Sequence, residues 1–171
     1  MRRHALLFTV VLCGTGSLSA VAGEGTVQGK MIVNGKTTAL THAYALAQPN
    51  SFHKEKEDIR VILSDAPISD EALRHDRDHL DKLAATGKFH AIAVTIGDDM
   101  FGHGKSADSN DIYTVEINKG WINTGGLDKF EMKSLDANAI AGRLHMKSVH
   151  DFTDEHATFD YDATFSAPIV H

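Results

Sequence analysis

The sequence predicts a mainly β (α+β) fold, an antiparallel β-sandwich or partly open barrel with one amphipathic helix inserted at about residues 70–86. Three observations predict it. Apolar and polar residues alternate along 158–167, as in a strand with one buried face. The dipeptide Asn34-Gly35 separates two strand-like arms, as in a hairpin. Only one segment has helical periodicity, which argues against a parallel βαβ fold.

The first residues have the pattern of a secretory signal peptide. Two arginines precede a short apolar run over 5–13, and a small-residue stretch then ends in an Ala-x-Ala motif at 20–22. The apolar run is too short to span a bilayer. We therefore expect residues 1–22 to be a leader that is cleaved after Ala22, and 23–171 to form a single β-rich domain.

Charge and cysteine content exclude several classes of function. The chain has 171 residues, with 17 Lys and Arg against 23 Asp and Glu. The leader holds two basic and no acidic residues, so the mature chain has 15 basic and 23 acidic residues and a net charge of −8. A nucleic-acid partner is not expected, because phosphate binding needs clustered Lys and Arg. The only cysteine, Cys13, leaves with the leader, which excludes disulfides and cysteine-bound zinc.

Three strands are expected before the helix, at 27–33, 36–46 and 59–63. A type I′ turn at Asn34-Gly35 joins the first two, because both positions of that turn need positive φ angles. In the second strand, alternation places His42 on one face with Leu40 and Tyr44. This position predicts either a buried neutral histidine with one hydrogen-bond partner or a residue that lines a pocket.

The start of the helix at 70–86 is well marked. Ser69 is a favourable N-cap, and Asp70 and Glu71 place negative charge in the first turn. Gly87 is a typical stop. One narrow apolar stripe should lie on the sheet, formed by Leu73, Leu80, Leu83 and Ala84.

Strand patterns return after the helix. The expected strands are 89–96, which is apolar on both faces and therefore central, 112–117, 129–134, 139–147 and 158–167. The sequence predicts polar or Gly-rich loops at 97–110 and 119–127. No long apolar segment remains in the mature chain, so we expect no membrane span there.

Four segments of the chain, VNGKTTALTHAYAL, IRVILSDAPI, AGRLH and FDYDATFSAPI, resemble a family of secreted bacterial proteins of uncharacterised function. The similarity covers most of 26–169, and its last block is the most specific. The resemblance implies secretion and a single domain. It supplies no catalytic residues, because the family has no established activity.

A histidine pair on the expected helix is the candidate metal site. His75 and His79 are four residues apart, a spacing that lets two imidazoles bind one Zn or Cu ion. Glu71 lies one turn earlier and can add an oxygen ligand. This face lies opposite the apolar stripe, so a solvated face without metal is the alternative. A further ligand would come from another part of the chain, such as His53, His103 or His150.

Two loop residues, Trp121 and His103, are candidates for contact with a ligand. Trp121 lies among glycines in 119–127, where it can recognise a ligand or fold back onto the core. His103 lies in a loop that ends in Gly-Lys-Ser, like a phosphate-binding loop. That loop lacks the earlier glycine of the full motif and follows two aspartates, so phosphate binding is not expected.

Carboxylates on the expected strands are the last candidates. Two carboxylates that flank a cleft suffice for glycoside hydrolysis. The same residues are also typical of a solvated strand face. The motifs of serine hydrolases and of calcium-binding loops are missing from the sequence. The strand carboxylates are Glu116, Glu131, Asp160 and Asp162.

These observations predict an exported, periplasmic or extracellular, non-enzymatic binding module whose partner is a protein, a glycan or a small molecule. The alternative is a metal-binding protein or metal-dependent hydrolase that uses His75 and His79. The edges of an open sheet also leave a homodimer open.

Overall fold

Eleven strands and three short helices make up the part of the chain that the computed structural model describes, residues 23–50, 53–98, 104–118, 120–123, 128–146, 149–152 and 157–171. The strands are β1 (Thr26–Val33), β2 (Lys36–Leu40), β3 (His42–Pro49), β4 (Glu57–Ser64), β5 (Ala91–Asp98), β6 (Lys105–Thr114), β7 (Gly120–Asn123), β8 (Asp128–Leu135), β9 (Ala139–Met146), β10 (His150–Phe152) and β11 (Ala157–Val170). The helices are α1 (Asp70–Arg74), α2 (Asp76–Ala84) and α3 (Val115–Asn118). The mainly β fold class predicted from the sequence is confirmed.

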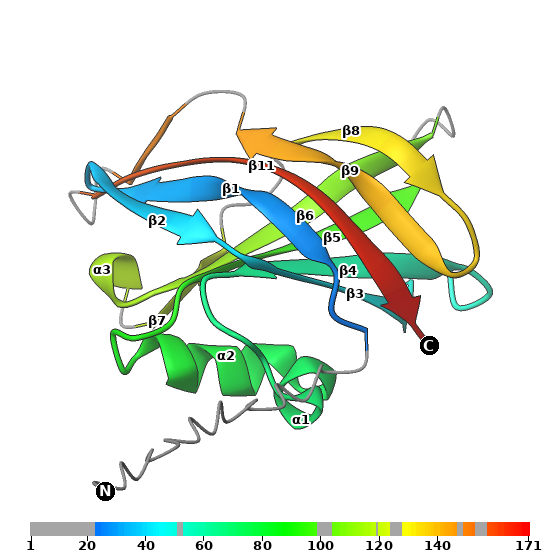
Figure 1. Ribbon diagram of the computed structural model, residues 1–171, viewed down its shortest axis with the longest axis horizontal. Helices are drawn as coiled ribbons and strands as arrows, with labels where there is room; N and C mark the ends of the chain where they lie inside the picture. Colours follow the sequence, from blue (N-terminus) through cyan, green and yellow to red (C-terminus); the bar gives the residue numbers. More distant parts are fainter. Residues whose placement is uncertain are drawn as a thin grey trace, which may run out of the picture.

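The strands form one open, mixed and mostly antiparallel sheet. Its main path runs β2-β1-β11-β3-β4-β5-β6-β7, while β9 and β10 also pair with β11, and β8 pairs with β9. One pairing is parallel and joins Ile169 and Val170 of β11 to Ala45 and Leu46 of β3. At this pairing the sheet folds over, so the half around β1, β9 and β11 faces the half from β3 to β7 (Figure 1).

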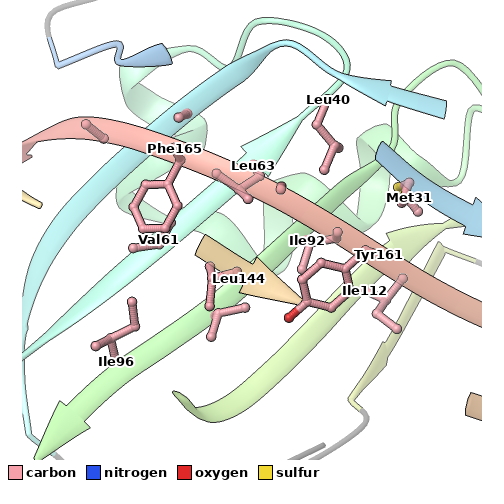
Figure 2. Packing of buried hydrophobic residues seen from close by; sticks show 14 of the residues in the cluster. Met31, Leu40, Val61, Leu63, Ile92, Ile96, Ile112, Leu144, Tyr161 and Phe165 are labelled. Atoms are coloured by element: carbon pink, nitrogen blue, oxygen red, sulfur yellow. The ribbon is translucent and has the colours of Figure 1, made fainter. Parts of the chain in front are cut away.

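The main hydrophobic core lies between the two halves of the sheet. Figure 2 shows Tyr161 and Phe165 of β11 and Leu144 of β9 among the side chains of the facing strands. On the other side, β4 and β5 contribute Val61 and Ile92, both fully buried. The alternation predicted for 158–167 is confirmed, because every second side chain of β11 from 159 to 167 is buried in this core.

A second core lies on the outer face of β3 to β7, where α1 and α2 cover the sheet (Figure 1). Tyr44 and Ile62 from the sheet pack there with Leu73 of α1 and Leu80 of α2. Strands β4 and β5 are therefore buried on both faces, which explains their continuous apolar sequences.

The first hairpin has the predicted turn, but its second arm is shorter than predicted. Asn34 and Gly35 have φ angles of 50° and 77°, as a type I′ turn requires. The arm ends at Leu40, and the chain then crosses to the other half of the sheet, where β3 begins at His42. Leu40 consequently lies in the main core and Tyr44 in the second one, so they do not share a face.

The helix predicted over 70–86 is broken. His75 adopts φ −128° and ψ 44°, so it ends α1 and precedes α2, which itself ends at Ala84. Leu73, Leu80 and Ala84 of the predicted stripe are buried, whereas Leu83 is 38% exposed. No helix in the described segments is long and apolar enough to cross a membrane.

Two boundaries after the helices also differ from the predictions. The segment 97–110 was expected to be a loop, but β6 already begins at Lys105 and pairs with β5. The strand expected over 112–117 ends at Thr114, where α3 begins. Lys105 pairs with Asp98 at 3.0 Å, so the lysine of the Gly-Lys-Ser sequence neutralises a strand carboxylate. Hydrogen bonds from Lys105 and Lys56 lower the pKa of Asp98.

Candidate functional site

An open pocket of about 310 Å³ lies beside α1, where β3, β4 and the end of β11 meet. The register of the sheet assembles its base, because Leu46 of β3 is paired with Arg60 on one side and Val170 on the other. Helix α1 forms the remaining wall. The lining residues are Leu46, Ala47, Gln48, Arg60, Asp70, Leu73, Arg74, Val170 and His171.

The start of α1 is fixed firmly against the sheet. The Ser69 hydroxyl caps the helix by accepting a hydrogen bond from the backbone N–H of Ala72, at 3.2 Å. The N–H of Ile68 donates to the Tyr44 hydroxyl of β3 at 3.0 Å. Burial is the main cause that raises the pKa of Tyr44, and the bond to Ile68 opposes it. Leu73 is buried beneath the helix, so α1 is also packed against the sheet at the wall of the pocket.

A buried ion pair forms part of the floor. Arg60 and Asp111 are both buried, and the Arg60 guanidinium donates directly to the Asp111 carboxylate. The guanidinium also donates to the Ala93 carbonyl at 3.3 Å and to the Thr95 hydroxyl at 3.2 Å, and Asn123 donates to Asp111 at 2.8 Å. Such bonds offset the large desolvation penalty of a buried pair. The network ties β4 to β7 and holds Arg60 at the pocket.

Two opposite charges lie on the α1 wall. Asp70 and Arg74 are exposed and line the pocket from the same short helix, four residues apart. Neither side chain forms a hydrogen bond or ion pair with another residue in the described part of the chain. By contrast, Arg60 is committed to Asp111, so the unmatched charges of the pocket are those on α1.

A second polar cluster surrounds His90, which immediately precedes β5. Its Nδ1 lies 2.7 Å from Asp65 Oδ2, and its Nε2 lies 3.3 Å from Glu116 Oε1. Glu116 also accepts hydrogen bonds from the Thr114 hydroxyl and from Lys36, the latter at 3.0 Å. Burial alone would raise the pKa of Glu116, but the hydrogen bonds from Thr114, Lys36 and His90 outweigh it and lower the pKa to about 2.

The cluster around His90 has the geometry of contacts that join elements of the fold, not that of a catalytic site. Both ring nitrogens of His90 contact carboxylates, so neither faces a position where a substrate could exchange a proton. Asp65 also accepts from the His90 N–H at 2.8 Å. The cluster joins the β1–β2 hairpin, the end of β4, the start of β5 and α3.

The structure brings the predicted metal residues near one another. The rings of His75 and His79 are 5.8 Å apart between centroids, and Glu71 Oε1 lies 4.0 Å from His79 Nε2. His79 Nδ1 faces the His75 carbonyl oxygen at 3.2 Å, so Nε2 is the nitrogen left for an ion. No group of three or more His, Asp or Glu side chains in the described residues has a metal-binding arrangement.

Of the other predicted ligand residues, His53 is not among the described residues that line the pocket. The backbone of Trp121 belongs to β7 and pairs with Tyr113, so this residue is on a strand and not in the loop that was predicted. His103 lies outside the described residues. His53 is exposed next to Glu55, and His150 begins β10.

His42 is not the buried histidine that its position suggested. It is only partly buried, and its Nδ1 lies 2.7 Å from Glu24 Oε1. The break in the strand after Leu40 explains the difference, because His42 begins a new strand at the rim of the second core.

The strand carboxylates are engaged in separate contacts. Asp162 accepts two hydrogen bonds from Arg143, at 2.8 and 2.6 Å, and these bonds lower its pKa. Glu131 lies 3.7 Å from the same Arg143 and 3.0 Å from His145. Asp160 is partly buried on the same strand as Asp162. Glu116 is not on a strand as predicted, because it lies in α3, where it belongs to the cluster around His90.

Sequence reasoning missed both the pocket and the cluster around His90. A signal was present for each, because Arg60 interrupts the apolar run 59–63 and His90 interrupts the apolar run 89–96. Their partners, Asp111 and Asp65, are not marked by any motif. Comparison of the chain with protein-family models, curated proteins and solved structures gives no match.

Proposed function

We propose that this protein is an exported, non-enzymatic binding module that takes a small molecule into the pocket between β3, β4, β11 and α1. The pocket itself is the observation that carries the proposal. Its volume of about 310 Å³ is at the lower end of the range typical of small-molecule sites. Apolar side chains and a few placed polar groups share its lining, as in such sites.

The construction of the pocket supports the same function. A buried ion pair is costly to desolvate, and this one holds the Arg60 guanidinium in place at the floor of the pocket. The neighbouring helix is capped and anchored on the sheet, so the pocket is preformed and a ligand would not have to order it.

A blocked pocket tests this proposal. Gln48 lines the pocket on β3, and Gln48→Trp should fill part of it without burying a charge. Thr164→Trp is the matched control, because Thr164 is exposed on the outer face of β11. Protein purified from the periplasm would be screened against a library of metabolites by thermal unfolding. Stabilising compounds should act on the wild type and the control but not on Gln48→Trp, and a screen without such a compound would refute the proposal.

Export is proposed from the leader and from the resemblance to secreted proteins. When the full chain is expressed in a bacterium, the periplasmic fraction should contain a protein whose intact mass equals that of residues 23–171. An uncleaved chain in the cytoplasm would contradict this part of the proposal.

Metal binding is the second candidate, and the approach of His75 and His79 favours it. Two imidazoles with centroids 5.8 Å apart can hold Zn²⁺ or Cu²⁺ weakly as a pair. Thermal unfolding with EDTA, and then with excess metal, tests it. A metal ion at a concentration of about 100 times its Kd raises the free energy of unfolding by roughly 2.7 kcal/mol. The metal-dependent rise in unfolding temperature should vanish in the double variant His75→Ala/His79→Ala. A rise that persists in this variant would place the ion elsewhere.

A further inference from the structure

We infer that the ligand of this pocket is a small zwitterion of the amino-acid type, with an ammonium group, a carboxylate and a branched apolar side chain. This inference rests on the proposed function and names its ligand class. Asp70 binds the ammonium, Arg74 binds the carboxylate, and the apolar side chain lies against the strands.

The charges of the pocket carry the first step. Asp70 and Arg74 are neighbours on one face of α1, and neither has an ionic partner in the described segments. Residues four apart on a helix have Cβ atoms roughly 5–6 Å apart. One compact molecule with both charges can therefore contact both side chains at once. A simple anion would leave Asp70 beside like charge, and a simple cation would do the same to Arg74.

The floor of the pocket adds no competing charge. Asp111 neutralises Arg60, whose guanidinium also donates to the Ala93 carbonyl and the Thr95 hydroxyl. Gln48 contributes a neutral amide. The imidazole of His171 lies 3.0 Å from the Ala137 carbonyl through Nε2. The charges of Arg60, Asp111, Asp70 and Arg74 thus sum to zero, which matches a zwitterion better than an ion of either sign.

The apolar part of the lining favours a ligand with an apolar side chain. Leu46, Leu73 and Val170 lie at the pocket, and Val170 is 36% exposed, so apolar surface is open to a ligand. Covering it stabilises a complex in proportion to the area buried. The volume of about 310 Å³ suits a ligand of the size of leucine.

Three matched compounds test the inference: leucine, 4-methylpentanoate, which lacks the ammonium, and 3-methylbutylamine, which lacks the carboxylate. Each would be titrated into ¹⁵N-labelled protein, with the amides of Ala47, Leu73 and Val170 as reporters. We expect leucine to bind about twofold to fivefold more tightly than either analogue, because exposed charge pairs are individually weak.

Variants assign each charge to its partner. In Asp70→Asn, leucine should bind no better than 4-methylpentanoate, and in Arg74→Met no better than 3-methylbutylamine. Lys133→Met, on the distant strand β8, is the control and should leave all three affinities unchanged.

The outcomes separate this inference from the proposed function. The inference that the ligand is a zwitterion is overturned if leucine and one analogue bind the wild type with equal affinity. It is also overturned if neither variant changes the affinity for leucine. If leucine fails while another compound binds in a manner that Gln48→Trp blocks, the ligand class is wrong and the binding function stands. If none of the three compounds and no compound of the library changes the chemical shifts of the pocket amides, both the ligand class and the proposed binding function are refuted.

Discussion

Replacement of Glu116 by Gln should remove a pH-dependent part of the stability of this fold. The Glu116 carboxylate accepts hydrogen bonds from Thr114, Lys36 and His90, which favour its charged form. In the folded protein these bonds lower its pKa from 4.5 to about 2, although burial acts in the opposite direction. Because the folded pKa lies below the unfolded one, the contribution is complete above pH 4.5 and is lost as the pH falls toward 2.

The size of the effect follows from the same shift. A lowering from 4.5 to about 2 corresponds to about 3 kcal/mol at neutral pH. The side chain is 23% exposed, and screening by water reduces the contribution to about 2 kcal/mol. By pH 3.5 about two fifths of it should be gone, because the unfolded state then binds a proton that the folded state does not.

Urea unfolding of the wild type and of Glu116→Gln at pH 7, 5 and 3.5 measures this contribution. The difference in free energy of unfolding should fall from about 2 kcal/mol at pH 7 to a little over 1 kcal/mol at pH 3.5. Glu131→Gln is the matched control, since Glu131 is 58% exposed and contacts a histidine on the outer face of the sheet. A difference for Glu116→Gln that is independent of pH, or equal to that of the control, would refute the reasoning.

Other substitutions test the sheet, the helix cap and the buried pair. Ser69→Ala removes the cap of α1 and should cost about 1 kcal/mol in urea unfolding, whereas Ser69→Asp should cost little. Gly29→Ala places a Cβ in steric overlap with the backbone of Ala163, so the expected result is a loss of more than about 3 kcal/mol or no soluble protein. Asp111→Asn breaks the buried pair and should cost about 3–5 kcal/mol, against less than about 1 kcal/mol for the exposed Asp162→Asn.

Features set by local physics were predictable from the sequence. The turn at Asn34-Gly35 needs two positive φ angles, which only a few residue types adopt readily, and the structure has them. The alternation along β11 follows from its position between a core and solvent. The start of α1 at Ser69 is equally local, because one hydroxyl satisfies a backbone N–H that the helix leaves open.

Features set by distant contacts were not predictable in the same way. The break at His75 has neither proline nor glycine beside it, and His75 makes no side-chain capping bond to α2. The crossing at Thr41 is similar, because no Gly, Pro, Asn or Asp interrupts 36–46. Only the pairing of β3 with β4 in the other half of the sheet ends the first arm. Periodicity describes which face is apolar, but it does not say which core that face will join.

The pocket shows the same limit most clearly. Its base requires Leu46, Arg60 and Val170 to lie side by side, and one parallel contact between β11 and β3 brings Val170 there. Parallel pairing of two short stretches more than a hundred residues apart leaves no trace in the local pattern. An arginine within an apolar strand is still a readable sign, because a buried cation needs a partner and hydrogen bonds. Charged residues that interrupt apolar runs therefore deserve to be tested as site residues before histidines on exposed helix faces.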